Sequence, residues 1–260
     1  MATRIRIINL FYYFGKMKYL TLILLIALSI TVKAQDNESF YVFDADWKPT
    51  KIESAHFMLH THMVNDTCWQ FDFYNFLGPL IKMEQYRDKV GTEINGVSRH
   101  YNNNGYIDST GEFSGGKRNG EFIKLVGDSL KSKWEYIYRD DSLIDLIDLE
   151  KEKEDPPISY NDEKESDYPS GLAGWQRYLQ KNLRYPERAM NGNIQGQVVV
   201  RFIVDKTGNV TDPYISASVE YSLDEEALRI IKGSGKWKPA FQNGHNVKSY
   251  KMQPINFRLQ

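Results

Sequence analysis

The sequence predicts an α+β fold in two parts: an N-terminal antiparallel sheet of β-hairpins, and a C-terminal three-stranded antiparallel sheet with packed helices. Between residues 35 and 143, short aromatic strands alternate with turns that contain Gly and Asn. An acidic segment with Pro156 and Pro157 follows and carries few large apolar residues, so it is a poor core. Beyond residue 167 the apolar pattern switches between the period of strands and that of helices, which favours an α+β unit.

The C-terminal strands are predicted from alternation and from turn residues. Apolar side chains two residues apart share one face of the first strand: Val198, Val200, Phe202 and Val204. Residues 205–209 form a turn, and residues 210–217 return as a second strand in which Pro213 indicates a bulge or an edge. Residues 242–245 form another turn, and residues 247–259 are the expected last strand.

Helices are predicted on both sides of these strands. The helix after the second strand is expected to begin with Ser222 as its cap and Glu225 at the capping-box position. An earlier amphipathic helix covers residues 172–183, and Pro186 favours the start of a short helix over residues 187–190. The apolar stripe of the earlier helix consists of Leu172, Trp175, Leu179 and Leu183.

Seven short motifs follow one another along this part of the chain. They are Tyr185-Pro186, Ile194-Gln195-Gly196, Asp205-x-x-Gly208-x-Val210, Leu223-Asp224-x-Glu226-Ala227, Trp237-Lys238-Pro239, Gln242-Asn243-Gly244 and Pro254-Ile255-Asn256-Phe257. In this order they resemble the C-terminal domain of the TonB family, over residues 167–260, in a version similar to those of Bacteroidetes-type energy transducers.

The resemblance implies a binding site for a peptide. In the TonB family the last strand is an edge with which a segment of a TonB-dependent outer-membrane receptor, the TonB box, pairs by β-augmentation. The implied binding residues are Arg184, Tyr185, Ser249, Tyr250, Lys251, Met252, Gln253, Ile255, Asn256 and Phe257. Pro254 removes one backbone donor from this strand, and a further proline at Ser249 or Lys251 is expected to abolish pairing.

The N-terminal strands contain an internal repeat. Two similar segments begin at Asn95-Gly96 and Asn119-Gly120, a spacing of 24 residues, and a period of this size is typical of stacked supersecondary units. The pattern resembles MORN-type hairpin repeats, and an ordinary antiparallel sheet is the alternative. Either arrangement predicts an elongated single-layer sheet that binds rather than catalyses, with glycines supplying positive φ at the turns.

Residues 1–34 predict export. Lys18 precedes an apolar run, and Val32 and Ala34 suit a signal-peptidase site, although an uncleaved membrane anchor is the alternative. The expected order is a signal peptide or N-terminal anchor (1–34), a hairpin-repeat domain (35–143), an acidic linker (144–166) and the TonB-like domain (167–260), located in the periplasm or cell envelope. This linker is much shorter than the proline-rich spacer of energy-transducing TonB proteins, which argues against direct energy transduction.

Composition and motifs exclude several function classes. The net charge of −1 gives no reason to expect nucleic-acid binding, and the single cysteine, Cys68, excludes an intramolecular disulfide. His56, His60 and His62 suggest a metal, but they lack a paired ligand motif, so surface or core histidines are expected and neither a metal nor a cofactor is predicted. No phosphate-binding loop or nucleophile elbow is present, so the chain is not expected to be an enzyme and no catalytic residue is assigned.

The sequence therefore predicts a periplasmic TonB-like protein that binds receptor peptides by strand pairing and supports TonB-dependent transport. The alternative is a secreted envelope scaffold that binds another envelope protein or a glycan through the hairpin sheet. A homodimer that occupies the same edge strand is left open.

Overall fold

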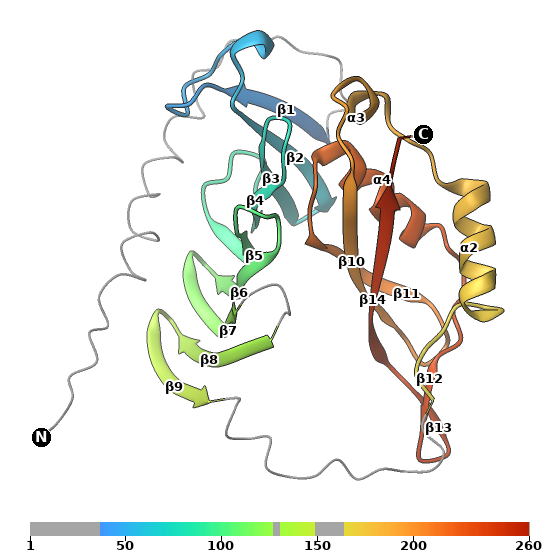
Figure 1. Cartoon of the computed structure of the whole chain (residues 1–260). Helices are drawn as coiled ribbons and strands as arrows, with labels where there is room; N and C mark the ends of the chain where they lie inside the picture. Colours follow the sequence, from blue (N-terminus) through green and yellow to red (C-terminus); the bar gives the residue numbers. More distant parts are fainter. Residues whose placement is uncertain (1–36, 127–130, 149–163, 260) are drawn as a thin grey trace, which may run out of the picture.

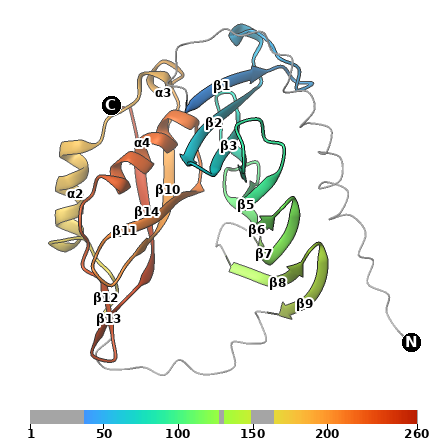
Figure 2. The ribbon, with the colours of Figure 1, turned by 180° about the vertical axis from the view of Figure 1, so that it is seen from behind.

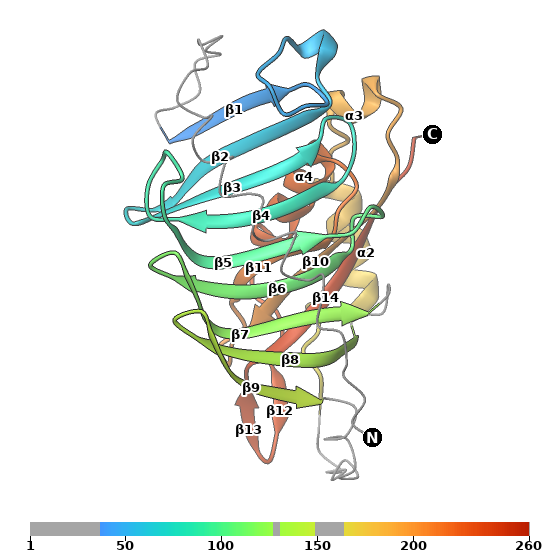
Figure 3. The ribbon, with the colours of Figure 1, turned by 90° about the vertical axis from the view of Figure 1, so that its left-hand side faces the viewer.

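The computed structural model describes residues 37–126, 131–148 and 164–259, which form an N-terminal and a C-terminal part (Figure 1). The N-terminal part is one antiparallel sheet whose nine strands lie side by side in chain order (Figure 3). Its elements are β1 (Glu38–Phe43), η3 (Ile52–Ser54), β2 (Phe57–Asn65), β3 (Cys68–Asn75), β4 (Leu80–Tyr86), β5 (Ile94–Tyr101), β6 (Ile107–Ser114), β7 (Lys117–Val126), β8 (Lys131–Arg139) and β9 (Ser142–Asp148).

The 24-residue repeat corresponds to every second strand of this sheet. Gly96 lies in β5 and Gly120 in β7, and both have positive φ, at 113° and 100°. Gly105, between β5 and β6, has a φ of 81°, as expected for a hairpin glycine. Each copy of the repeat therefore corresponds to one hairpin of an antiparallel meander.

The C-terminal part confirms the predicted α+β unit. Its three-stranded antiparallel sheet has the order β11-β10-β14, and β12 and β13 form a separate hairpin around the predicted turn at residues 242–245. Its elements are α2 (Gly171–Asn182), α3 (Glu187–Asn191), β10 (Gly196–Val204), β11 (Val210–Ala217), α4 (Tyr221–Lys232), β12 (Ala240–Gln242), β13 (His245–Val247) and β14 (Ser249–Phe257). Figures 1 and 2 show α2 on the side of this part that faces away from the nine-stranded sheet.

Helix α4 does not begin as predicted, because its cap is Glu220 rather than Ser222. The Glu220 carboxylate accepts hydrogen bonds from the Ser222 backbone nitrogen at 2.8 Å and from the Ser222 hydroxyl at 2.6 Å. A buried negative charge here is favoured by the positive end of the helix dipole. In α2 the predicted apolar stripe is wrong at Leu172, which is 70% exposed, whereas Trp175 is buried against Trp237.

Two predicted boundaries are also wrong. Strand β9 runs to Asp148, so residues 144–148 belong to the sheet and not to the acidic linker. Residues 149–163 lie outside the described residues. The predicted last strand is two strands, because Val247 ends β13 and Ser249 begins β14.

The two parts share one hydrophobic core through α4, which contacts both sheets. Leu223 and Ile230 of α4 are fully buried in the core that includes β10, whereas the Tyr221 ring meets the rings of His60 and Tyr74 in the N-terminal sheet at 5.1 and 5.6 Å. Buried side chains from the N-terminal sheet in this core are Met58, Tyr74, Leu80, Met83, Tyr101 and Ile107. The predicted single layer is therefore covered on one face by the C-terminal part along part of its length.

Polar contacts also join the two parts. The backbone nitrogen of Leu80 donates to the Ser218 hydroxyl at 2.8 Å, and the Tyr101 hydroxyl donates to the Ile215 carbonyl at 2.8 Å. The Tyr74 hydroxyl donates to Asp224 at 3.2 Å, and burial raises the pKa of this carboxyl well above its usual range. Because these groups are removed from water, each needs its partner across the interface.

In the part of the chain that the structure describes, no helix is long and apolar enough to cross a membrane. The predicted signal peptide or anchor, residues 1–34, lies outside the described residues.

Candidate functional site

Strand β14 forms one edge of the three-stranded sheet. It pairs with β10 in unbroken register, from Ser249 opposite Val204 to Phe257 opposite Gly196. Among the described strands, only β10 pairs with β14. The second side of its backbone therefore offers a template for another strand.

The direction of the β14 backbone groups follows from Pro254. This residue lies opposite Val199 and has no N–H, so the two cannot form a hydrogen-bonded pair. The Val199 carbonyl instead accepts a hydrogen bond from the Ser216 hydroxyl in β11 at 3.2 Å, on the side away from β14. The polar groups of Pro254 therefore point to the outer edge of β14.

The same direction applies to every second residue of the strand. The outer edge carries the backbone groups of the four even-numbered residues: Tyr250, Met252, Pro254 and Asn256. Since Pro254 has no N–H, this edge offers three donors and four carbonyl acceptors. Ser249 and Lys251 point their N–H groups toward β10, so a proline at either position would break the internal ladder and would remove no donor from the outer edge. The loss of pairing expected from the sequence for these prolines would therefore come through the internal ladder.

The side chains of β14 divide between the two faces of the sheet. Ile255 and Phe257 are buried in the core, whereas Tyr250 is 71% and Met252 52% exposed on the opposite face. The two exposed side chains lie directly beside the outer backbone edge, where they would contact a strand that paired there.

Two other side chains of this strand have fixed partners. The Lys251 ammonium donates to the Ser166 carbonyl at 2.7 Å, and Asn256 accepts a hydrogen bond from the Gln197 side chain at 2.9 Å. The Gln253 side chain donates to the adjacent Pro254 carbonyl, at 3.4 Å. Lys251 therefore attaches the start of β14 to the segment that precedes α2.

The predicted flank, Arg184 and Tyr185, lies at the other end of the strand. The Tyr185 ring meets that of Phe257 at 5.9 Å, edge to face, and its hydroxyl donates to the Ile194 carbonyl at 2.5 Å. The Arg184 backbone nitrogen donates to the Glu226 carboxylate at 2.7 Å. The residue itself is exposed. The structure thus brings the flank and the end of β14 together.

The histidines considered as ligands do not form one group. His60 and His62 lie on one face of β2, as predicted, but the exposed His56 contacts the Ser54 carbonyl instead, at 3.2 Å. Cys68 begins the next strand and does not join the group of possible ligands that the described residues contain.

The sequence interpretation missed Asp72, which lies opposite His60 in β3. This aspartate is 5% exposed, and its carboxylate approaches both His60 and His62. The available signal was an acidic residue between Phe71 and Phe73, in a strand whose other side chains are mostly aromatic or apolar.

Comparison with known proteins finds a match for the C-terminal part. Residues 181–259 match the family described as Gram-negative bacterial TonB protein C-terminal. The NMR solution structure of the TonB C-terminal domain of Helicobacter pylori matches with 28% sequence identity over 33% of this chain and 77% of that chain, at a TM-score of 0.29. The search of curated proteins finds no match.

Proposed function

We propose that this chain, which carries a TonB-family C-terminal domain at residues 181–259, binds outer-membrane receptor peptides at the outer edge of β14 and supports TonB-dependent transport in the periplasm. The observation that carries the proposal is the unpaired side of β14, with its three donors and four acceptors in a row. Binding by strand addition needs such a row, because backbone hydrogen bonds provide most of the affinity and side-chain pockets provide selectivity.

The geometry suits weak and reversible binding. Each backbone hydrogen bond contributes about 1 kcal/mol net, and association opposes this with the loss of translational freedom. The missing donor at Pro254 interrupts the ladder before its end, so a peptide makes its longest continuous contact along Tyr250 and Met252. Those exposed side chains would add apolar contacts with the peptide.

Met252→Pro is expected to weaken binding of receptor N-terminal peptides by about fivefold or more, since it removes one outward donor worth about 1 kcal/mol. Met252→Ala is the matched control, because it shortens the same side chain and keeps the donor. Isothermal titration calorimetry with the full chain and synthetic receptor peptides measures both. We expect the alanine variant to bind within about threefold of the wild type and the proline variant to retain the wild-type unfolding midpoint, since proline is tolerated at edge positions that face away from the ladder.

Equal peptide affinities for the proline and alanine variants would contradict pairing at this edge. Lys251→Pro supplies a second comparison, because its N–H points toward β10. We expect that variant to lose stability as well as binding, whereas Met252→Pro loses binding alone.

A second candidate function is favoured by exposed apolar side chains on β9. Leu143, Ile144 and Leu146 are 52%, 52% and 49% exposed on this edge strand of the nine-stranded sheet. Such a surface suits a scaffold that binds an envelope protein or a glycan without coupling to transport. This function predicts that a chain lacking the β14 edge contact still binds its partner, and that deletion of the gene leaves receptor-dependent uptake unchanged.

A further inference from the structure

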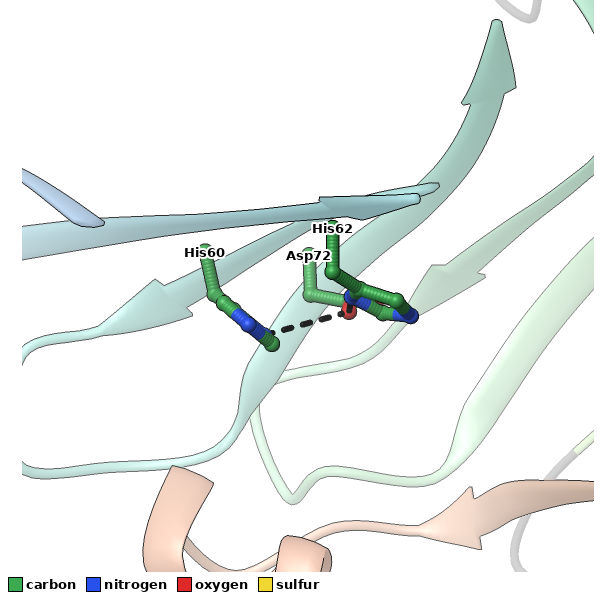
Figure 4. Close-up of side chains that lie close together, drawn as sticks. All are labelled: His60, His62 and Asp72. Carbon is green, nitrogen blue, oxygen red and sulfur yellow. Dashed lines mark ion pairs between the residues drawn. The ribbon is translucent and has the colours of Figure 1, made fainter. Parts of the chain in front are cut away.

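The place where β1, β2, β3 and α4 meet contains a group of ligand-type side chains that the proposed function does not use. His60, His62 and Asp72 each offer one ligand atom, and the three atoms lie within 4.8 Å of one another (Figure 4). Both histidine Nδ1 atoms are 3.7 Å from the same carboxylate oxygen of Asp72. His60 and Asp72 are only 2% and 5% exposed.

The contact between Glu38 and His60 fixes the state of the His60 ring. Its Nε2 lies 2.7 Å from the Glu38 carboxylate, so Nε2 carries the proton and donates it to this hydrogen bond. A neutral imidazole has a single N–H, so a proton on Nε2 leaves Nδ1 without one. Nδ1 therefore presents a lone pair toward Asp72.

This nitrogen has no hydrogen-bond partner among the residues that the structure describes. The buried Nδ1 atoms of His60 and His62 both lack a hydrogen-bond partner among the described residues, because 3.7 Å to Asp72 is too long for a hydrogen bond. Gln70 donates to both oxygens of Asp72, at 2.9 and 3.2 Å, and holds the carboxylate in this orientation. Three ligand-type atoms thus lie within 4.8 Å of one another, and both histidine nitrogens among them have no hydrogen-bond partner in the part of the chain that the structure describes.

A divalent metal ion satisfies all three groups. Two ligands of a tetrahedral zinc ion, each about 2.0–2.1 Å from the metal, are separated by about 3.3 Å. The two His–Asp distances are a few tenths longer, at 3.7 Å, and the three atoms, which lie within 4.8 Å of one another, would draw together around the ion. The His62 side chain is 30% exposed, so the group is open to solvent at this ligand, where an ion and a water ligand would enter. The Glu38–His60 contact is the carboxylate–histidine pair that orients metal-binding imidazoles.

We propose that His60, His62 and Asp72 bind a divalent transition-metal ion of the zinc type, with Glu38 and Gln70 positioning the ligands. Two imidazoles and one carboxylate select zinc-like ions over calcium or magnesium, which prefer oxygen ligands only. The Tyr221 ring of α4 lies 5.1 Å from the His60 ring, so the ion would sit beside the contact between the two parts of the chain. The site is separate from β14, and its failure would leave the peptide proposal unaffected.

Cobalt titration of the untagged, chelator-treated full chain tests the proposal. We expect about one equivalent of Co²⁺ to bind with visible d–d absorption and to be displaced by Zn²⁺. His62→Gln and Asp72→Asn are expected to lose this signal. His56→Gln is the matched control, because His56 is an exposed histidine outside the group and should leave the titration unchanged.

Glu38→Gln distinguishes a metal site from buried histidines with a purely structural role. Glu38 is 43% exposed and touches His60 only through the distal nitrogen, so the variant is expected to fold and to bind Co²⁺ about 10- to 100-fold more weakly. Absence of stoichiometric Co²⁺ and Zn²⁺ binding in the wild type would overturn the proposal. Wild-type affinity in a folded His62→Gln or Asp72→Asn variant would overturn it equally.

Discussion

Gly105→Ala is expected to destabilise the chain by about 3 kcal/mol, from about 1–2 kcal/mol of left-handed backbone strain and a similar overpacking cost. Gly105 has a φ of 81°, and a Cβ at this position would lie 2.2 Å from the Ser218 carbonyl oxygen of the C-terminal part. The clash is with backbone, which no rotamer change relieves. Moving Ser218 would also disturb the hydrogen bond from its nitrogen to the Gly105 carbonyl, 2.9 Å long, and the bond from Leu80 to its hydroxyl.

Gly115→Ala is the matched control, because it introduces backbone strain without the steric contact that an alanine at Gly105 makes with Ser218. Gly115 also has positive φ, at 58°, but the atom nearest to its added Cβ is a Glu93 side-chain oxygen at 3.9 Å. Urea unfolding measures the free energy of unfolding of both variants. We expect Gly115→Ala to lower it by about 1 kcal/mol and Gly105→Ala to lower it by about 2 kcal/mol more. Equal losses would mean that the two parts do not meet at Gly105 in solution.

The sequence predicted glycines at the hairpin turns, of which Gly105 is one, but it did not predict a contact between the two parts at this residue. Its turn and the 24-residue spacing are local patterns, and local patterns determine hairpins well. The covered face of the sheet depends on residues such as Tyr74 and Leu80, whose partners Asp224 and Ser218 are 150 and 138 residues away. The alternation of a strand specifies two faces, but it does not specify which protein surface covers either of them.

At the β14 edge too, local patterns predicted the strand, but long-range pairing determines which way its groups point. The residues after the turn at 242–245 were predicted to form the last strand, and the resemblance to the TonB family implied that this strand is an edge. The side to which each N–H points requires the register with β10, and this register makes Met252 rather than Lys251 the informative position. Asp72 was missed because its approach to His60 depends on pairing between β2 and β3, which a search for closely spaced ligands in one segment does not detect.

Arg188→Ala is expected to cost about 3 kcal/mol of stability, because it leaves the Glu220 carboxylate buried without its cationic partner. Glu220 is 0% exposed, and the Arg188 guanidinium donates to it and to the Phe76 carbonyl, in the loop between β3 and β4. The same guanidinium lies 4.7 Å from the centre of the Phe76 ring. One side chain of α3 therefore joins the cap of α4 to the N-terminal sheet. Arg177→Ala, which removes an exposed arginine of α2, is the control and should change stability by less than about 0.5 kcal/mol.

A double-mutant cycle with Glu220→Gln tests the cause of this loss. If Arg188 acts mainly by neutralising a buried charge, its removal should cost only about 1 kcal/mol once glutamine stands at position 220, since no unpaired carboxylate remains. The residual cost then measures the contacts with Phe76. Additive losses in urea unfolding would instead indicate that the hydrogen bonds from Ser222 are sufficient to hold Glu220 in the folded state. Such a result would assign Arg188 to the contact between the two parts alone, whereas a coupling of about 2 kcal/mol would establish it as the counterion of the helix cap.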